Sequence, residues 1–535
     1  MFRSLRTPLA GVALATAAIV GLAGCSAADP EPVVVTGGVL DFALGANPGC
    51  LDPHQTTLID SLYVSRQTTE SLVAMDTETG EILPWLADSW EVNDDATVYT
   101  FTLHEGVTFS DGDVFDAEAV KANFDAMTAL GALATRAQPY ISSLVSTEVV
   151  DEYVVALTFS TPNAPLLSGL STINMGMHSP TSLALTPEER CQGLLADTGP
   201  FVIDSYTTDV GVSLIAREDY DWAPPQSEHT GRAILDGIEF TIIPESSVRI
   251  GSLLSGQIDA MMGVQPQDEA QIVATDGVIL SAVNPGIPMQ LNVDVSRPIM
   301  SDENVRVAVM HAINREEIKE TVLSDAFPVS TSILTAGLPG YADLSEYMEF
   351  DTDLAEELLD DSGWVLGSDG VRTKDGQPLS LLLKYASNNN YNRPAMELVQ
   401  LQLASIGIAV ELVEFPGTGF TDAREARDWD LFLSNSTDVD PNVMRSSFSA
   451  RSLNYHNLPE PESTEMADLY DLQRVTADPA ERADLVAQIQ EEIVSKAYSI
   501  PIFDLAQVIA TTSGVSGVVW DTTARPSLYA VSVSE

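Results

Sequence analysis

The sequence predicts a mixed α/β protein built from at least two lobes, and three observations lead to this fold class. The chain has 535 residues, far more than a single hydrophobic core usually serves. Hydrophobic residues make up 45% of it and charged residues only 19%, which is a globular composition. Short runs with strand patterning alternate with helical patterns along the chain, and this mixture is typical of α/β or α+β folds.

The predicted elements follow one another in an order that turn residues mark. A first strand is expected at 38–46, where Asn47, Pro48 and Gly49 end it. A helix is expected at 58–74, and another runs from Asp116, its candidate N-cap, to Leu130. Further strands are predicted at 149–159, 212–216, 234–243, 379–385, 408–413 and 430–433, and further helices at 246–255, 303–313, 315–323, 353–361, 393–405 and 479–497.

The N-terminus has the organisation of an export signal. Arg3 and Arg6 precede an apolar stretch at 9–22, which is too short and too rich in Gly and Ala for a membrane span of roughly 20 residues. Residues 22–25 (LAGC) resemble the lipobox of bacterial lipoproteins, which implies that Cys25 carries a lipid. We therefore expect a signal peptide at 1–24, a lipidated tether at 25–36 and a lipid-anchored protein at the extracellular face of the cell membrane. The alternative is an ordinary secretory signal that contains a cysteine.

The formal net charge is −53, and the acidic residues are spread along the chain. Such a surface repels nucleic acid and anionic lipid, so we expect no nucleic-acid partner and no bilayer contact except through the Cys25 anchor. The two remaining cysteines are Cys50 and Cys191. An oxidising exterior favours a disulfide between them, and two buried free thiols are the alternative. In the chain-entropy model a bridge across so long a loop contributes about 4–5 kcal/mol.

The sequence contains none of the common catalytic motifs. The six histidines form no helical zinc pair, and neither H-E-x-x-H, nor G-x-S-x-G, nor a phosphate-binding or dinucleotide-binding glycine motif occurs. The carboxylates are so numerous that a solvated surface explains them better than a catalytic pair does. We therefore predict that the protein is not an enzyme and has no catalytic residues, no cofactor and no metal site.

Several short segments, in their order along the chain, resemble the bacterial extracellular solute-binding proteins of family 5, which include oligopeptide-, dipeptide- and nickel-binding proteins. The segments are 83–90 (LPWLADSW), 106–112 (GVTFSDG), 255–259 (SGQID), 304–308 (NVRVA), 311–315 (HAINR) and 362–364 (SGW). Asn314 stands where the family usually has Asp. Each piece is weakly specific, but the series spans nearly the whole mature chain.

The resemblance implies a two-lobed periplasmic-binding-protein-like fold with an extra domain inserted in the first lobe and a hinge-closing cleft. Mapped onto this chain, lobe I takes 37–80, 196–285 and 507–535, the inserted subdomain takes 81–195, and lobe II takes 286–506. Cys50 and Cys191 then both lie near the junction of lobe I and the inserted subdomain, which supports the bridge.

The resemblance also implies the function of a substrate-binding lipoprotein of an ABC importer. A solute, most simply a peptide, enters the cleft, the lobes close on it, and a membrane permease receives it. The protein is expected to act as a monomer. The alternatives are a binding protein for an oligosaccharide or another neutral organic solute, a surface receptor or chaperone on the same scaffold, and a secreted hydrolase.

The residues that would identify the solute only partly match the family pattern. Peptide-binding relatives place an acidic residue four positions before a proline, but counting back from Pro441 gives Thr437, with Asp438 one place later. No arginine precedes Arg393 in the earlier lobe II loop, and a nickel site is not expected because neither loop contains a histidine. An alternative is that the loops are shifted by one residue, so that Asp438 and Arg393 bind the peptide termini. The candidate ligand-binding residues are Asn47, Ser387, Asn388, Asn435, Thr437, Asp438 and Tyr455.

Overall fold

The computed structural model describes residues 36–534. The first of its sheets along the chain has seven strands. We call the region around this sheet lobe I. Strand β1 is parallel to its neighbours β10 and β11, whereas β21 is antiparallel to both β11 and β12. The strand order is β12 (Val278–Val283), β21 (Ala506–Thr511), β11 (Ala260–Met262), β1 (Val39–Leu44), β10 (Gly237–Ile242), β9 (Gly211–Ala216) and β8 (Phe201–Thr207). Its helices include α1 (Ile59–Ser65), α7 (Ser246–Leu254) and α8 (Pro266–Val273).

A four-stranded antiparallel sheet lies between β3 (Ile82–Pro84) and β8 in the sequence, and we call the region around it the inserted subdomain. Its order is β4 (Ala87–Val92), β5 (Val98–Leu103), β7 (Val154–Phe159) and β6 (Leu144–Asp151). In β5 the alternate residues Tyr99, Phe101 and Leu103 are buried, as expected for a strand with one face on a core. Its helices are α2 (Ala117–Leu130), α3 (Gln138–Ile141), α4 (Leu166–Leu170), α5 (Pro180–Leu183) and α6 (Pro187–Cys191).

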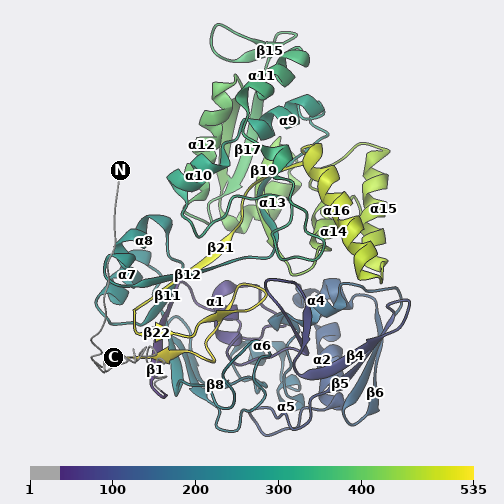
Figure 1. Cartoon of the computed structure of the whole chain (residues 1–535). Helices are drawn as coiled ribbons and strands as arrows, with labels where there is room; N and C mark the ends of the chain where they lie inside the picture. Colours follow the sequence, from purple (N-terminus) through teal and green to yellow (C-terminus); the bar gives the residue numbers. More distant parts are fainter. Residues whose placement is uncertain (1–35, 535) are drawn as a thin grey trace, which may run out of the picture. The chain divides into compact units, whose positions relative to one another are not determined.

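A five-stranded mixed sheet forms the centre of what we call lobe II (Figure 1). All eight residues of its strand β13 are buried, which is typical of a strand covered on both faces. The order is β18 (Ala409–Phe415), β17 (Ser380–Ala386), β19 (Leu431–Thr437), β13 (Gly286–Val293) and β20 (Ser499–Phe503). The helices are α9 (Glu303–His311), α10 (Arg315–Val322), α11 (Thr352–Asp361), α12 (Asn392–Ser405), α13 (Phe420–Glu425), α14 (Val443–Phe448), α15 (Glu462–Val475) and α16 (Pro479–Ser495).

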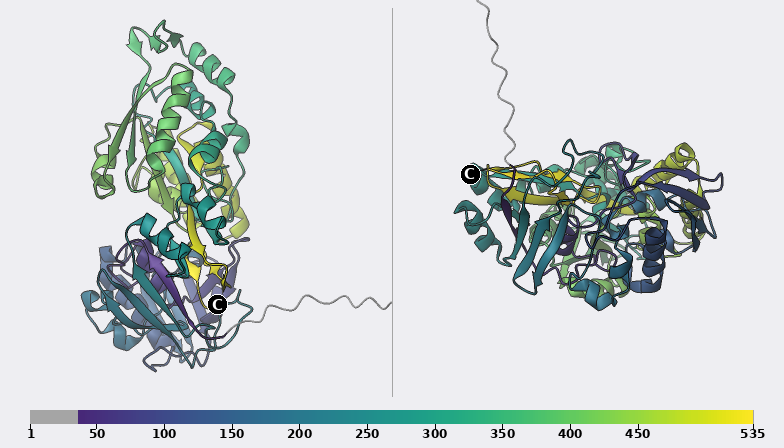
Figure 2. Two further views of the ribbon diagram at one scale, coloured as in Figure 1. Left: turned by 90° about the vertical axis from the view of Figure 1, so that its left-hand side faces the viewer. Right: turned by 90° about the horizontal axis from the view of Figure 1, so that it is seen from below.

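The chain passes between the two large sheets twice, and each crossing is two residues long. Asn284 and Pro285 connect β12 to β13, and Asp504 and Leu505 connect β20 to β21. The crossings lie side by side, because the backbone N–H of Asn284 donates to the carbonyl of Leu505 at 2.7 Å. Figure 2 shows the second crossing in yellow, running from the lobe II sheet to the lobe I sheet.

The remaining elements are short. They are the strands β2 (Val73–Met75), β3 (Ile82–Pro84), β14 (Val365–Leu366), β15 (Arg372–Lys374), β16 (Gln377–Pro378), β22 (Val515–Ser516), β23 (Val519–Trp520), β24 (Pro526–Ser527) and β25 (Ser532–Val533), with 3₁₀ turns at Gly131–Leu133, Ile173–Met175, Ser345–Met348 and Gly417–Gly419. Among the described residues, no helix is both long and apolar enough to cross a bilayer. The predicted signal peptide and the lipid on Cys25 lie outside the described residues.

The structure confirms the predicted mixed fold class, and it contains the predicted disulfide between Cys50 and Cys191. The predicted cap of α2 is also present, since the carboxylate of Asp116 accepts a hydrogen bond from the backbone N–H of Ala119 at 2.9 Å.

The helix predicted at 58–74 is wrong in its second half, because α1 ends at Ser65. The backbone N–H groups of Gly199 and Phe201 donate to the carbonyls of Thr68 and Gln67 at 2.8 and 3.2 Å. The carbonyl groups that would have accepted the next hydrogen bonds of the helix are therefore bonded to a segment distant in the sequence.

Candidate functional site

The loop after β19 meets the inserted subdomain at the segment that leads into α3. Nη1 of Arg136 donates to the carbonyl of Thr437 at 2.6 Å, and the hydroxyl of Tyr140 donates to Oδ1 of Asp438. Arg136 and Thr437 are separated by 301 positions in the sequence, so these bonds join two distant parts of the chain. This meeting point is the polar centre of a candidate ligand site between the lobes.

The loop that carries Asp438 is fixed by its bonds to the first crossing. The backbone N–H of Asp438 donates to the carbonyl of Pro285 at 3.0 Å, and Nδ2 of Asn284 donates to Oγ1 of Thr437 at 3.1 Å. Gly286 has a φ of +117°, and a Cβ there would lie 2.2 Å from the carbonyl oxygen of Ser436. Only glycine therefore allows β13 and the end of β19 to approach so closely.

The site combines one carboxyl group with two guanidinium groups. Burial raises the pKa of Asp438, while its bond from Tyr140 and the positive charge of Arg136 act in the opposite direction. Arg525 is 5% exposed, and burial lowers its pKa, as does the nearby charge of Arg136. Nη1 of Arg525 donates to the carbonyl of Thr523 at 2.6 Å, whereas its buried Nε has no hydrogen-bond partner.

A cavity of about 30 Å³ lies between these groups, which is enough for one or two water molecules but not for a peptide. Its lining comprises Leu62, Arg136, Tyr140, Thr172, Asn174, Thr437, Asp438, Val439, Thr523 and Arg525. Val439 also lines a neighbouring cavity of about 240 Å³, which contacts Pro285, Leu338 and Trp520. A larger solute therefore needs the lobes to separate at this point or has to occupy the neighbouring space.

A neighbouring flank of the interface contains a larger cavity of about 620 Å³. It lies between the inserted subdomain, represented by Tyr99 and Ser168, and the part of lobe II that contains Pro441 and Arg482. The guanidinium of Arg482 is already paired with the buried carboxylate of Asp440. This flank therefore offers volume, while the charged groups that remain for a ligand lie at the Arg136–Asp438 centre.

Of the residues predicted to bind ligand, the structure brings Thr437 and Asp438 to this centre. Asn435 lies on the same strand without reaching the cavity lining, and Tyr455 packs inside lobe II with its ring centroid 6.1 Å from that of Phe432. Asn47 is bonded within lobe I, where it accepts from the hydroxyl of Tyr206 at 2.7 Å.

The lobe II loop after β17 lies elsewhere. Ser387 and Asn388 are exposed, and Oδ1 of Asn388 accepts from Nδ2 of Asn392 at 3.2 Å. Arg393 forms ion pairs with Glu414 and Glu397 rather than pointing at Asp438.

The sequence analysis missed Arg136, Tyr140 and Arg525. No local motif marks any of them, because they become neighbours of Asp438 only through the packing of the inserted subdomain and the C-terminal segment against lobe II. The scarcity of cations offered a weak signal, since the chain has only 25 Lys and Arg residues among 535.

Comparison with known proteins gives one family match and many relatives. Residues 81–454 match the model described as bacterial extracellular solute-binding proteins, family 5 Middle. The chain is 25% identical to the nickel-binding periplasmic protein of Escherichia coli K12 over 426 residues, covering 76% of this chain and 77% of that one. It is also 25% identical to the glutathione-binding protein GsiB of the same strain over 535 residues, covering 96% of each.

Solved structures agree in fold. NikA from Brucella suis in complex with Fe(III)-EDTA superposes with a TM-score of 0.81 at 24% identity, covering 93% of this chain and all of that one. DppA from Helicobacter pylori in complex with the peptide STSA gives a TM-score of 0.71 at 23% identity, covering 94% and 99%. At these levels of sequence identity, the solved structures show that the fold is similar and nothing more.

Proposed function

The chain belongs to family 5 of the bacterial extracellular solute-binding proteins, which serve ABC importers, and from this premise we propose that it is a lipid-anchored protein that captures a peptide. Members of this family bind and deliver solutes and are not enzymes. The observation that carries the peptide assignment is that Asp438, Arg136 and Arg525 line one cavity, where the charge of Arg136 also acts on the pKa of Asp438. A carboxylate and guanidinium groups on facing surfaces complement the two charged ends of a zwitterion.

In the proposed complex, the ammonium group of the peptide binds the carboxylate of Asp438 and displaces the hydroxyl of Tyr140. The peptide carboxylate pairs with Arg136, whose Nη1 otherwise donates to a backbone carbonyl, or with the unpartnered Nε of Arg525. The Asp438 carboxyl becomes ionised when it meets an ammonium group, which offsets the raised pKa that burial imposes. Side chains of the peptide extend into the neighbouring cavity next to Trp520.

Binding and release follow from the hinge. The ligand would contact Arg136 from the inserted subdomain and Asp438 from lobe II together only in a nearly closed state, with the lobes slightly further apart here than in this structure, and it would therefore stabilise that state. A membrane permease then receives the solute when the lobes reopen. The lipid on Cys25 would hold the protein at the membrane that contains this permease. The names of two relatives support a peptide cargo, since one is named for glutathione and one solved neighbour contains the peptide STSA.

The first experiment is native mass spectrometry of the protein purified from rich medium, followed by calorimetric titration with defined peptides. We expect a mass, or a ladder of masses, that disappears on denaturation and corresponds to peptides. Blocking the peptide N-terminus by acetylation should weaken binding at least about 30-fold, because it leaves the Asp438 carboxylate without its charged partner.

Matched variants test the assigned residues. Asp438→Asn and Arg136→Gln should each weaken peptide binding by a similar factor, whereas Arg393→Gln, on a surface ion pair, should leave it unchanged. Equal binding by Asp438→Asn and the unaltered protein would contradict the proposed site. Co-purified sugars or other neutral solutes, with no response to any peptide, would instead assign the cleft to a neutral ligand.

A further inference from the structure

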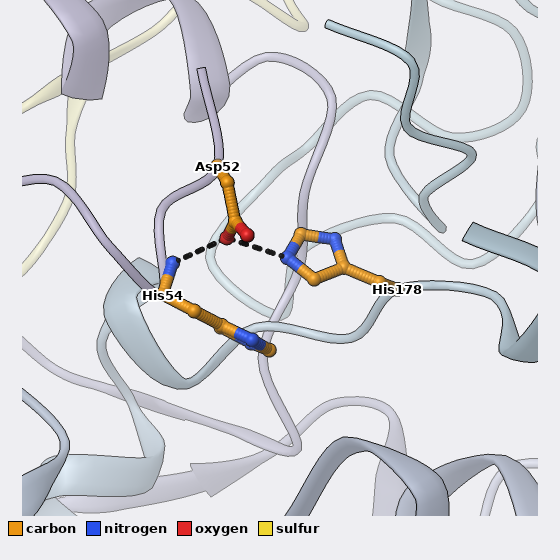
Figure 3. Close-up of side chains that lie close together, drawn as sticks. All are labelled: Asp52, His54 and His178. Atoms are coloured by element: carbon orange, nitrogen blue, oxygen red, sulfur yellow. Dashed lines mark hydrogen bonds and ion pairs between the residues drawn. The ribbon is translucent and has the colours of Figure 1, made fainter. Parts of the chain in front are cut away.

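Three polar side chains form a buried cluster away from the cleft, where the loop after Cys50 packs against the segment before α5. Asp52, His54 and His178 are 0%, 2% and 0% exposed. Figure 3 shows them close together, with the carboxylate of Asp52 between the backbone N–H of His54 and the ring of His178. In the described part of the chain, none of the three lines the cavities between the lobes.

Each of the two imidazole rings is fixed by a hydrogen bond from one of its nitrogens, while the other nitrogen forms no hydrogen bond. Nδ1 of His178 bonds to Oδ1 of Asp197 at 2.6 Å, and Nε2 of His54 bonds to the carbonyl oxygen of Gly176 at 2.8 Å. Nε2 of His178 and Nδ1 of His54 are buried and have no hydrogen-bond partner. The ring centroids are 4.3 Å apart. Buried polar atoms are normally satisfied, so two such nitrogens in adjacent rings require an explanation.

The carboxylate of Asp52 is also held in place by neighbouring groups, at both of its oxygens. Its Oδ2 accepts from Nε2 of Gln55 at 2.6 Å and lies 3.2 Å from Nε of Arg190. Its Oδ1 accepts from the backbone N–H of His54 at 2.8 Å and forms an ion-pair contact of 3.3 Å with Nε2 of His178. One ligand atom from each of the three residues lies within 4.8 Å of the others. Zinc ligands about 2.1 Å from the ion lie about 3.4 Å apart, so ligand atoms that lie within 4.8 Å of one another would have to move closer together to share one ion.

We propose that Asp52, His54 and His178 form a buried structural site for a divalent transition metal of the zinc class. Metal-binding histidines almost always donate their second ring N–H to a carboxylate or a backbone carbonyl, and here Asp197 and Gly176 occupy those two positions. Two imidazoles and one carboxylate are donors that suit Zn²⁺, Co²⁺ or Ni²⁺. The assignment does not depend on the solute that the cleft binds.

The position of the site indicates what the metal would do. Asp52 lies two residues after Cys50, and Arg190, which contacts Asp52, directly precedes Cys191. The ion would therefore join the loop after Cys50 to the segment around His178, close to the disulfide, and would fix the inserted subdomain on lobe I. Because the three side chains are buried, the ion would enter while the protein folds and would not exchange with the transported solute.

A proton is the competing occupant. A protonated His178 between Asp52 and Asp197 would satisfy both carboxylates, and it would balance their charge together with Arg190. The proton, however, leaves Nδ1 of His54 without a partner, whereas a shared ion provides one for both free nitrogens. The two alternatives differ in whether the folded protein contains a metal.

The test uses the secreted protein without a histidine tag and with Cys25→Ser, which removes the thiol of the predicted lipid attachment site. Metal content is measured after folding in the presence of Zn²⁺, Co²⁺ or Ni²⁺, and the thermal midpoint is compared with that of protein unfolded and refolded with a chelator, because the buried ion is accessible only in the unfolded chain. We expect one ion per chain, a visible absorption spectrum of tetrahedral Co²⁺, and a lower midpoint after removal. A folded protein that takes up none of the three ions, with a midpoint that the chelator leaves unchanged, would overturn the proposal and leave a proton as the only occupant.

Variants locate the ion. His54→Gln and His178→Gln should each lose the ion, whereas His456→Gln should keep it. His456 is an informative control because it is also buried with a free Nδ1, but its Nε2 bonds to the hydroxyl of Ser499 at 2.7 Å and it is not part of the cluster. Undiminished metal in a folded His54→Gln variant would place the ion elsewhere. If the variants fail to fold, the uptake measured on the unaltered cluster still decides the proposal.

Discussion

Glu70 is a carboxyl group in the interior of lobe I, with 1% of its surface exposed. It accepts hydrogen bonds from the hydroxyl of Tyr220 at 2.5 Å and from Nε1 of Trp222 at 2.8 Å. Burial raises the pKa of Glu70 to about 8, despite these donors and the nearby charge of Arg66. The folded protein therefore holds this group protonated at neutral pH, whereas the unfolded chain ionises it.

This difference predicts how stability depends on pH. Because the pKa in the folded state lies above that in the unfolded state, the contribution of Glu70 is fully present below about pH 4.5 and is lost as the pH rises through about 8. Glu70→Gln should remove this loss, on the order of a few kcal/mol, so that the variant unfolds at higher denaturant than the unaltered protein at pH 9 and not at pH 5. Chemical denaturation at both pH values measures this difference in stability between the variant and the unaltered protein. Glu239→Gln, an exposed residue of β10, is the control and should follow the unaltered protein. Parallel pH profiles for Glu70→Gln and the unaltered protein would show that Glu70 ionises normally.

At the scale of single elements, the junction of β13 and β19 depends on the backbone freedom of Gly286. Gly286→Ala would place a methyl group 2.2 Å from the carbonyl oxygen of Ser436 in a backbone conformation that L-residues rarely adopt. We expect it to lower the free energy of unfolding by about 2–3 kcal/mol and to weaken peptide binding, because the Asp438 loop is displaced.

Gly251→Ala provides the matched comparison. Gly251 lies within α7, and a Cβ there would meet no atom within 4 Å, so the substitution should stabilise the protein by about 0.5–1 kcal/mol. Urea titration of both variants measures the two changes. A Gly286→Ala variant as stable as the unaltered protein would show that the junction can adjust.

Elements defined by local patterns were predictable from the sequence, and those defined by distant contacts were not. The α2 helix was predicted with its cap, because Asp116 and the apolar spacing after it act within one segment. The second half of the predicted helix at 58–74 failed, because Gly199 and Phe201 bond to its carbonyls from far along the chain. The residues of the candidate site likewise divide into those marked by a local pattern and those brought in by distant contacts. Thr437 and Asp438 could be named from their spacing to Pro441, whereas Arg136 and Arg525 reach them only through the tertiary fold.

At the scale of the whole molecule, the disulfide closes a long loop, since Cys50 and Cys191 are separated by 141 positions. Replacing both by Ala should lower the free energy of unfolding by about 4–5 kcal/mol, because the unfolded chain regains the freedom that the bridge removes. Thermal and urea denaturation of the double variant measure the loss. Cys25→Ser, outside the bridge, is the control and should leave stability unchanged. A double variant with unaltered stability would mean that contacts around Asp52 and Arg190 suffice to hold the two segments together.

The pair of short crossings also limits how the lobes can move. A single tether would let lobe II rotate about any direction, but two adjacent tethers, bonded through Asn284 and Leu505, leave essentially one axis of rotation. Points near that axis travel little and points far from it travel furthest. Asp438, bonded to Pro285 in the first crossing, lies close to this axis and would move little when the lobes separate. A solute bound to Asp438 would therefore keep this contact longer than any contact that it makes farther from the crossings.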